Sequence, residues 1–188
     1  MNGPIIPSAK RREAGNHSPI AIETERLCLR QLTIEDAPFI LEVLTDPSFL
    51  RFVGDRNVRT VEQAADYILS GPITSYQRFG FGLLLTALKD GNTPIGICGL
   101  LQREALEDVD LGFALLPPFR GQGYATECAS AALTNGHVTL GLQRMVAIVS
   151  PDNAASIRVL DKLGFRFERK VRLTEDSDEI DLLAWHAG

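Results

Sequence analysis

The sequence has few cysteines and histidines and no long apolar run. Its three cysteines, Cys28, Cys98 and Cys128, are odd in number and widely spaced. Neither a disulfide framework nor a metal-ligand pattern is indicated, so we expect reduced core thiols in a cytoplasmic protein. The longest apolar stretch, FGFGLLLTAL, has ten residues and is too short to span a bilayer. The three histidines and the single tryptophan stand alone, and we assign them no catalytic or metal-binding role.

An excess of basic charge is also absent. The 188 residues include 19 Lys and Arg against 24 Asp and Glu, a formal net charge of −5. This balance argues against bulk binding of nucleic acid or of an anionic membrane. The N-terminal segment lacks the apolar core of a secretory signal, and its Pro, Gly and charge content predicts a disordered tail over residues 1–20. Residues 21–188 are predicted to form one domain, since no repeat or linker is visible.

Hydrophobic periodicity predicts a mixed α/β fold. We expect a half-buried strand over 22–32, a helix from Thr33 that stops before Pro47, and a helix from Thr60 to Gly71. The elements predicted after these are strands over 79–89, 95–102 and 108–116, a helix over 124–140, a strand over 145–150, a helix over 153–164, and two antiparallel strands over 165–173 and 180–186. The strands over 79–89 and 95–102 are expected to form a hairpin around Asp90-Gly91.

The segment LPPFRGQGYATE, residues 115–126, passes from a strand through a glycine-containing turn into a helix. The first N–H groups of a helix lack internal partners, and the helix dipole is positive at that end. Gly121 and Gly123 remove Cβ atoms, so phosphate oxygens can approach successive N–H groups, and Arg120 adds a positive charge. A diphosphate is the natural ligand, and a connector without a ligand is the alternative. Neither the Walker pattern nor the three-glycine dinucleotide pattern fits these residues.

Several segments together resemble one family. RGQGYA fits R-x-x-G-x-A, and SPDNAASIRVLDKLGF follows about thirty residues later. With TERLCLR, PIGICGLL and DLGFALLPPFRGQGYATE, they resemble the GNAT superfamily of acyl-CoA N-acyltransferases over about residues 22–186. The likeness is greatest to the branch of ribosomal-protein alanine and serine N-terminal acetyltransferases.

The resemblance implies acetyl-CoA as cosubstrate, no metal, and a mostly antiparallel sheet of about seven strands with about four helices. The sheet is expected to splay between its fourth and fifth strands. The implied acceptor is the amine of a peptide, a protein N-terminus or a small molecule, and the chain is expected to be a monomer or a homodimer. A non-catalytic acyl-CoA-binding sensor or interaction module is the alternative function.

By the same resemblance, the glycine turn holds the coenzyme A diphosphate, and the pantetheine arm pairs with the fourth strand. Asp110, Gly112 and Ala114 share one face of that strand by the two-residue period, and the last two are small enough to leave room for the arm. The implied coenzyme-binding residues are Phe113, Ala114, Leu115, Arg120, Gly121, Gln122, Gly123, Tyr124, Ala125, Asn153 and Ser156.

Three side chains are candidates for the proton transfers. In the N-x-x-S pattern, Asn153 is implied to contact the coenzyme and Ser156 to lie near its thiol, with helix capping as the alternative. The tyrosine frequently found seven residues after that asparagine is Leu160 here. Asp110 stands where the branch often carries Glu; it is either a base acting through a water or a solvated strand-end carboxylate. Glu168 is a second candidate base.

No residue is an obvious base, which favours an acceptor that is an α-amine or another amine with a low pKa. About a tenth of an α-amine with a pKa near ~8 is neutral at pH 7, against well under ~0.1% of a lysine amine. Acidic residues form either a solvated loop or an electronegative rim that attracts a cationic acceptor. These are Glu104, Glu107, Asp108, Glu175, Asp176, Asp178, Glu179 and Asp181.

Overall fold

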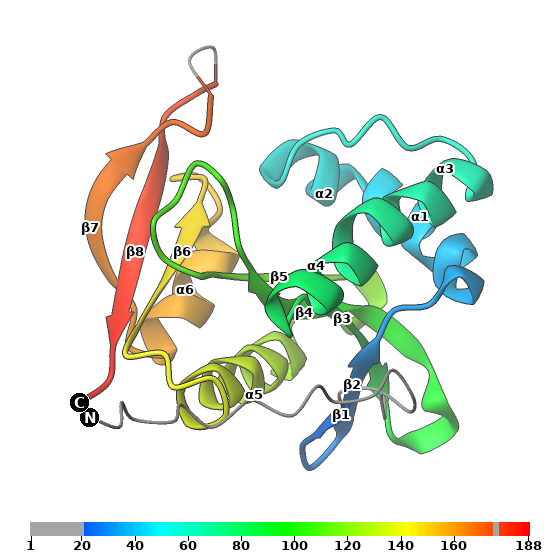
Figure 1. Ribbon diagram of the computed structural model, residues 1–188, viewed down its shortest axis with the longest axis horizontal. Helices are drawn as coiled ribbons and strands as arrows, with labels where there is room; N and C mark the ends of the chain where they lie inside the picture. The colour runs from blue at the N-terminus through cyan, green and yellow to red at the C-terminus, as the bar shows by residue number, and fades with distance from the viewer. Residues whose placement is uncertain (1–20, 175–176) are drawn as a thin grey trace, which may run out of the picture.

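The computed structural model describes residues 21–174 and 177–188, so the predicted disordered tail lies outside the described residues. They form a mixed α/β fold around one sheet with the strand order β1-β2-β3-β4-β5-β6-β8-β7 (Figure 1). The strands are β1 (Ala21–Glu23), β2 (Leu27–Gln31), β3 (Leu83–Leu88), β4 (Pro94–Leu101), β5 (Asp110–Leu115), β6 (Arg144–Val149), β7 (Arg166–Val171) and β8 (Ile180–His186). All neighbours are antiparallel except β5 and β6, which are parallel. The predicted architecture is confirmed, with eight strands in place of seven.

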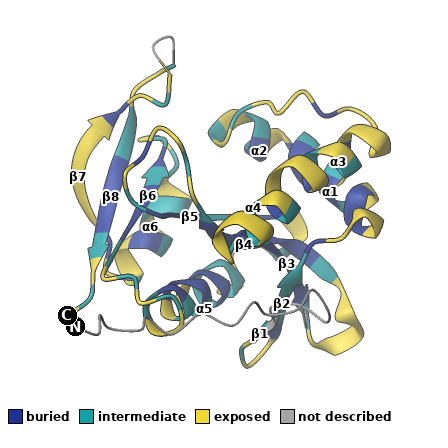
Figure 2. Cartoon of the chain, viewed as in Figure 1, coloured by how far each residue is buried: buried dark blue, intermediate teal, exposed yellow. Residues whose placement is uncertain are grey.

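Helices cover both faces of this sheet. They are α1 (Ala37–Thr45), α2 (Pro47–Phe52), α3 (Val61–Ile68), α4 (Thr74–Phe79), α5 (Tyr124–Val138) and α6 (Ala154–Lys162), with a π turn at Leu69–Ile73 and 3-10 turns at Ile34–Asp36, Asp90–Asn92 and Pro117–Phe119. The period of two along β3 sends Leu84 into a core beneath α5 and α6, and Leu85 into a second core beneath α1 and α3. Helices α5 and α6 therefore pack on one face of the sheet, and α1 and α3 pack on the other (Figure 2).

The prediction of one strand over 22–32 is wrong, because the chain turns back within it. The Thr24 backbone N–H donates to the Leu27 carbonyl at 2.9 Å, and the Leu27 N–H donates to Thr24 Oγ1 at 2.9 Å. The hydroxyl group closes a turn that contains neither glycine nor proline, and β1 pairs with β2 across it.

One predicted helix end is confirmed and another is corrected. α1 stops before Pro47 as predicted, but Pro47 begins a further helix, α2, where Asp46 is the N-cap and accepts from the backbone N–H groups of Ser48 and Phe49. The helix capped by Thr60 does not end at Gly71, since a π turn containing Pro72 carries the chain into α4. The continuous helical segment from α3 through the π turn to α4 ends at Gly80, the C-cap of α4, which has a φ of 80°.

The other predicted elements are confirmed with shifted ends. The β3–β4 hairpin turns at Gly91, which has a φ of 72°, and Gly164, with a φ of 88°, follows α6. Strands β7 and β8 are antiparallel, and β8 lies between β6 and β7. The back half of the chain thus returns to the sheet so that β6 stands beside β5.

Candidate active site

The sheet divides between β5 and β6. Only Asp110 and Val146 are in parallel register, where the Val146 N–H donates to the Val109 carbonyl at 2.9 Å. Two residues further along β6, the Ile148 N–H donates to the Asp110 carboxylate (Oδ1, 3.3 Å) instead of a β5 carbonyl. The carboxylate thereby takes the place of a ladder acceptor and ends the pairing. The predicted splay lies at this point.

This division leaves backbone groups of β5 available. The Val109 carbonyl points toward β6, and backbone direction alternates along a strand, so the N–H and C=O of Phe113 also face the splay. The Leu115 carbonyl, two residues on, accepts from Arg120 Nε at 2.8 Å, whereas the Leu116 N–H donates to Ile95 of β4. Phe113 can therefore offer a hydrogen-bond donor and an acceptor to an extended chain lying in the gap.

Two cavities meet at the splay. The glycine-turn cavity, about 360 Å³, extends to Gly121, Gly123, Ala125 and Thr126. The Asp110 cavity, about 400 Å³, extends to Asp110, Arg103 and Tyr67. The residues lining both are Phe49, Phe52, Val53, Phe113, Ala114, Asn153 and Ser156. Two reactants entering from opposite sides would meet beside Phe113 and Ser156.

The glycine turn leads into α5 as predicted. Gly121 and Gly123 have φ values of 74° and 85°, in the left-handed region that favours glycine. Within residues 21–174 and 177–188, no hydrogen-bond acceptor lies at the backbone N–H groups from Gly121 to Thr126. The first helical bond runs from the Glu127 N–H to the Gly123 carbonyl at 3.0 Å. A run of unpaired N–H groups at a helix N-terminus suits an anion.

The Arg120 side chain contacts α2. Its guanidinium donates to Ser48 Oγ at 2.9 Å and pairs with Asp46 Oδ1 at 2.6 Å. Asp46 is buried, with 8% of its surface exposed, so the ion pair and the bond to Leu115 fix the end of β5 against the N-terminus of α2. The Arg120 guanidinium, predicted to bind the diphosphate, is thus paired with a carboxylate of the same chain. Arg120 still lines the glycine-turn cavity.

Of the remaining predicted coenzyme-binding residues, Gln122 and Tyr124 do not line the glycine-turn cavity. The Gln122 side chain donates to the Pro118 carbonyl at 2.7 Å, and the Tyr124 ring lies under the Arg26 guanidinium, 4.4 Å from its centroid. Ala125 and Leu115 line the glycine-turn cavity. Gln122 and Tyr124 therefore belong to the turn through their backbone.

Asn153 and Ser156 lie both at the cap of α6 and at the walls of the two cavities. Asn153 caps α6, since its Oδ1 accepts from the Ser156 backbone N–H at 3.1 Å. Both residues also line both cavities. Capping leaves the Ser156 hydroxyl available, because the capping bond uses only its backbone. Leu160, one turn further on, is buried and lines the Asp110 cavity.

Asp110 is buried, with 1% of its surface exposed, so its interpretation as a solvated strand-end carboxylate is wrong. Burial raises the pKa of Asp110, and the opposing attraction comes from Arg103, whose Nε lies 2.6 Å from Oδ2. Arg103, seven residues earlier, lines the same cavity and favours the ionised carboxylate. A buried carboxylate with a raised pKa at a cavity wall suits a general base.

Glu168 is not part of this site. It lies on the exposed edge strand β7 and lines neither cavity. Both of its carboxylate oxygens accept from Arg144, at 2.9 and 3.0 Å, and these hydrogen bonds lower the pKa of Glu168. We therefore do not retain it as a candidate base.

The structure adds residues that sequence reasoning missed. Arg158 and Lys162 line the glycine-turn cavity from α6, on the same face as Ala155 and Val159. Their spacing of four residues is a helical-face signal that the sequence contains. At the Asp110 cavity, the acidic residues Asp178 and Glu179 lie with arginines that include Arg51 and Arg56. Glu175 and Asp176 of the predicted rim lie outside the described residues; among the described ones, the rim is mixed in charge rather than uniformly electronegative.

Comparison with known proteins agrees with this geometry. The Acetyltransferase (GNAT) domain family matches residues 26–166, and the chain belongs to that family. It is 32% identical to the uncharacterized N-acetyltransferase YoaA of Bacillus subtilis over 80% of this chain and 85% of the relative. The solved acetyltransferase of Agrobacterium tumefaciens superimposes with a TM-score of 0.78 at 26% identity, covering 94% of this chain and all of that one.

A more distant neighbour shares the fold. RimL, a ribosomal alpha-N-protein acetyltransferase solved in complex with coenzyme A, has a TM-score of 0.76 at 21% identity, covering 89% and 98% of the two chains. In the described part of the present chain, no group of three or more His, Cys, Asp or Glu could hold a metal ion. No helix among the same residues is long and apolar enough to cross a membrane.

Proposed function

We propose that this acetyltransferase moves an acetyl group from acetyl-CoA to a primary amine by direct attack while both substrates are bound. The observation that carries the proposal is the meeting of two cavities at the splayed strands. One cavity ends at a helix N-terminus with unpaired N–H groups, and the other contains a buried carboxylate. Simultaneous binding of both reactants can supply much of the rate acceleration.

The glycine-turn cavity is the proposed donor site. The N–H groups from Gly121 to Thr126 would bind the diphosphate, and Arg158 and Lys162 would lie near the other phosphate of the coenzyme. The extended arm would run along β5, with an amide N–H of the arm donating to the Phe113 carbonyl. The donor supplies an activated acyl thioester at the inner end of the arm.

At that inner end, chain groups perform three tasks. The Phe113 N–H faces the splay and would donate to the acetyl oxygen as negative charge develops there, which needs no particular side chain. The Ser156 hydroxyl would donate to the departing thiolate. Asp110 would accept the proton of the amine, directly or through a water, with Arg103 holding the carboxylate ionised and in place.

The Asp110 cavity is the proposed acceptor site. Its volume of about 400 Å³ suits a small amine or the first residues of a peptide. The fold neighbour RimL is named as a ribosomal alpha-N-protein acetyltransferase, which favours an α-amine. We therefore propose the α-amine of a protein or peptide as acceptor, ahead of a small-molecule amine.

The test is a screen of peptides and amines with acetyl-CoA, following release of free thiol and the mass of each product. We expect acetylation of α-amines above that of lysine side chains. Exclusive lysine modification would contradict the acceptor class. Binding of acetyl-CoA without turnover across the whole panel would instead support an acyl-CoA-binding module.

A further inference from the structure

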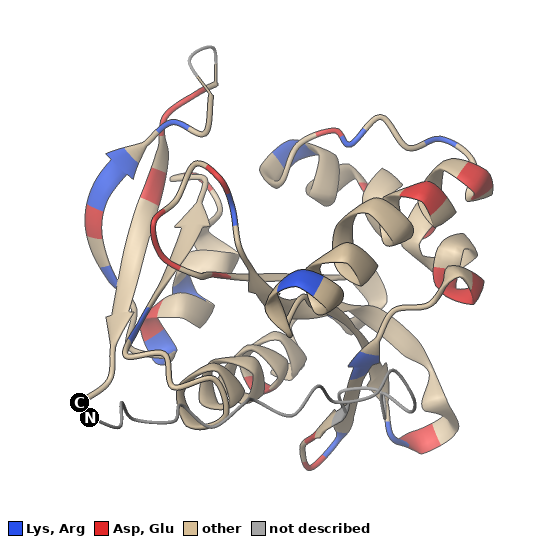
Figure 3. Ribbon diagram, viewed as in Figure 1, with Lys and Arg blue, Asp and Glu red and all other residues tan. Residues whose placement is uncertain are grey.

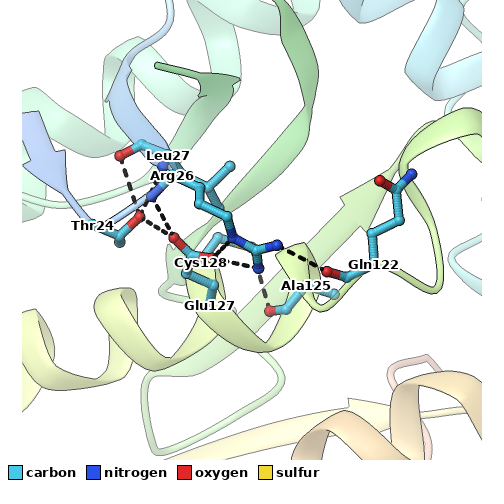
Figure 4. A network of polar contacts seen from close by, with 7 residues as sticks. All are labelled: Thr24, Arg26, Leu27, Gln122, Ala125, Glu127 and Cys128. Atoms are coloured by element: carbon cyan, nitrogen blue, oxygen red, sulfur yellow. Dashed lines mark hydrogen bonds and ion pairs between the residues drawn. The ribbon is translucent and has the colours of Figure 1, made fainter. Parts of the chain in front are cut away.

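The turn between β1 and β2 contacts the glycine turn through one arginine (Figure 4). Arg26 donates from Nη1 to the Gln122 carbonyl at 3.1 Å, and its guanidinium lies over the Tyr124 ring. Its Nη2 would be 3.3 Å from a Cβ placed on Gly123. Arg26 thus packs against three successive residues of the turn. It lines neither cavity itself.

The bond to the Gln122 carbonyl fixes the direction of the next N–H group. A trans peptide is planar, with its C=O and N–H pointing in opposite directions. The carbonyl of Gln122 and the N–H of Gly123 belong to the same peptide. Since the carbonyl is held toward Arg26, the Gly123 N–H points away from it, and this N–H has no acceptor within the described residues. Glycine can adopt many backbone conformations, and the bond to Arg26 favours the one seen here, with a φ of 85° at Gly123.

The same arginine neutralises an unfavourable charge. Glu127 is the single Asp, Glu, Lys or Arg residue of α5, and it lies in the first turn, where an anion is to bind (Figure 3). Its carboxylate accepts from the backbone N–H of Arg26 at 2.9 Å, from Arg26 Nε at 2.7 Å and from Thr24 Oγ1 at 2.6 Å. Burial opposes its ionisation, but these bonds outweigh burial and lower the pKa of Glu127. Glu127 is therefore ionised and needs the cation beside it.

We infer that Arg26 is a positioning residue for the diphosphate of the donor: it orients the Gly123 N–H and cancels the charge of Glu127. This inference rests on the proposed function, because the diphosphate site is that of acetyl-CoA. Arg26 acts through the turn and through Glu127 rather than by touching the reacting atoms. Its removal should weaken binding of the diphosphate and leave the acyl-transfer step unchanged.

The experiment compares two donors in Arg26→Gln. Acetyl-CoA contains the diphosphate, whereas S-acetylpantetheine has the same thioester and arm without it. Without Arg26, the Gly123 N–H would lose its hydrogen bond to the charged diphosphate. We expect the KM for acetyl-CoA to rise roughly tenfold or more. We expect kcat with acetyl-CoA, and kcat/KM with S-acetylpantetheine, to stay within about twofold of the wild type. Arg78→Gln, at an exposed arginine of α4 outside both cavities, is the matched control.

A second variant separates positioning from loss of folding. In Arg26→Gln/Glu127→Gln the unpaired carboxylate is gone, so we expect the KM for acetyl-CoA to recover in part. Unchanged KM in Arg26→Gln, or an equal loss with both donors, would overturn the inference while leaving the proposed function intact. If Gly123→Asp also leaves acetyl-CoA affinity unchanged, the diphosphate site itself fails, and the inference fails with it.

Discussion

Replacing Asp110 by asparagine tests the proposed base. Asparagine keeps the shape of the side chain and an oxygen for the Ile148 N–H, but it cannot take a proton. General-base catalysis contributes about 10²–10⁴-fold, so we expect kcat/KM at pH 8 to fall at least ~100-fold, which is ~2.7 kcal/mol of transition-state stabilisation.

The pH dependence isolates this carboxylate from the acceptor. Burial raises the pKa of Asp110 above the ordinary value, so its base form is lost at a higher pH than for a solvated aspartate. The titration of the acceptor amine is common to both proteins and cancels in the ratio of wild-type to variant kcat/KM. We expect this ratio to rise with pH through the pKa of Asp110 and then to become constant.

The raised pKa of Asp110 also determines how its contribution to the free energy of unfolding changes with pH. Because the folded-state pKa is raised, Asp110 stabilises the native state most at low pH, and this contribution is lost as the pH rises through its folded pKa. Asp110→Asn also removes the counter-charge of Arg103 and turns an amide NH2 toward its Nε, so we expect a loss of stability that is measured beside the rate. Asp108→Asn is the control, since Asp108 pairs with Arg144 and lines neither cavity. A ratio that is flat with pH, or an Asp110→Asn enzyme as active as the control, would refute the assignment of Asp110 as base.

Three further predictions concern the donor site. Gly123→Asp should abolish acetyl-CoA binding in calorimetry, because it places a carboxylate at the diphosphate and a side chain at a φ of 85°; unchanged affinity would remove the turn from the site. Ser156→Ala should lower kcat with little change in coenzyme affinity or melting temperature, since the capping bond uses its backbone N–H; an unaltered rate would leave Ser156 as a helix residue only. Arg158→Gln/Lys162→Gln should weaken coenzyme A roughly tenfold and dephospho-coenzyme A less; equal losses would argue against contact with the additional phosphate.

The sequence predicted the elements that depend on local backbone chemistry. Gly121 and Gly123 marked the strand-to-helix turn because only glycine readily adopts positive φ, and Asp90-Gly91 marked the β3–β4 hairpin for the same reason. The turn after β1 was missed because a threonine hydroxyl closes it. Gly71 was misleading because the chain does not stop there: a π turn at Leu69–Ile73 continues into α4.

The site was predictable in residue type but not in partners. Strand alternation placed Asp110 on the cavity face, yet its burial depends on Arg103 and on the Ile148 N–H, which only the fold brings to it. Arg120 showed a charge near the turn, but nothing local revealed that Asp46, 74 residues away, would take it. The contact of Arg26 with the glycine turn could not be predicted for the same reason, since 96 residues separate it from Gln122.

The early end of the β5–β6 pairing has a consequence for how the molecule holds together. In the proposed binding mode, a donor paired with Phe113 of β5 would also lie against Asn153 and Ser156 at the start of α6, so the cosubstrate would bridge the two sides of the splay. A ligand that binds the native chain and not the unfolded chain raises the free energy of unfolding by RT ln(1 + [L]/Kd), where [L] is its free concentration. If the proposed donor site is correct, the concentration of coenzyme would set the stability of this protein as well as its rate.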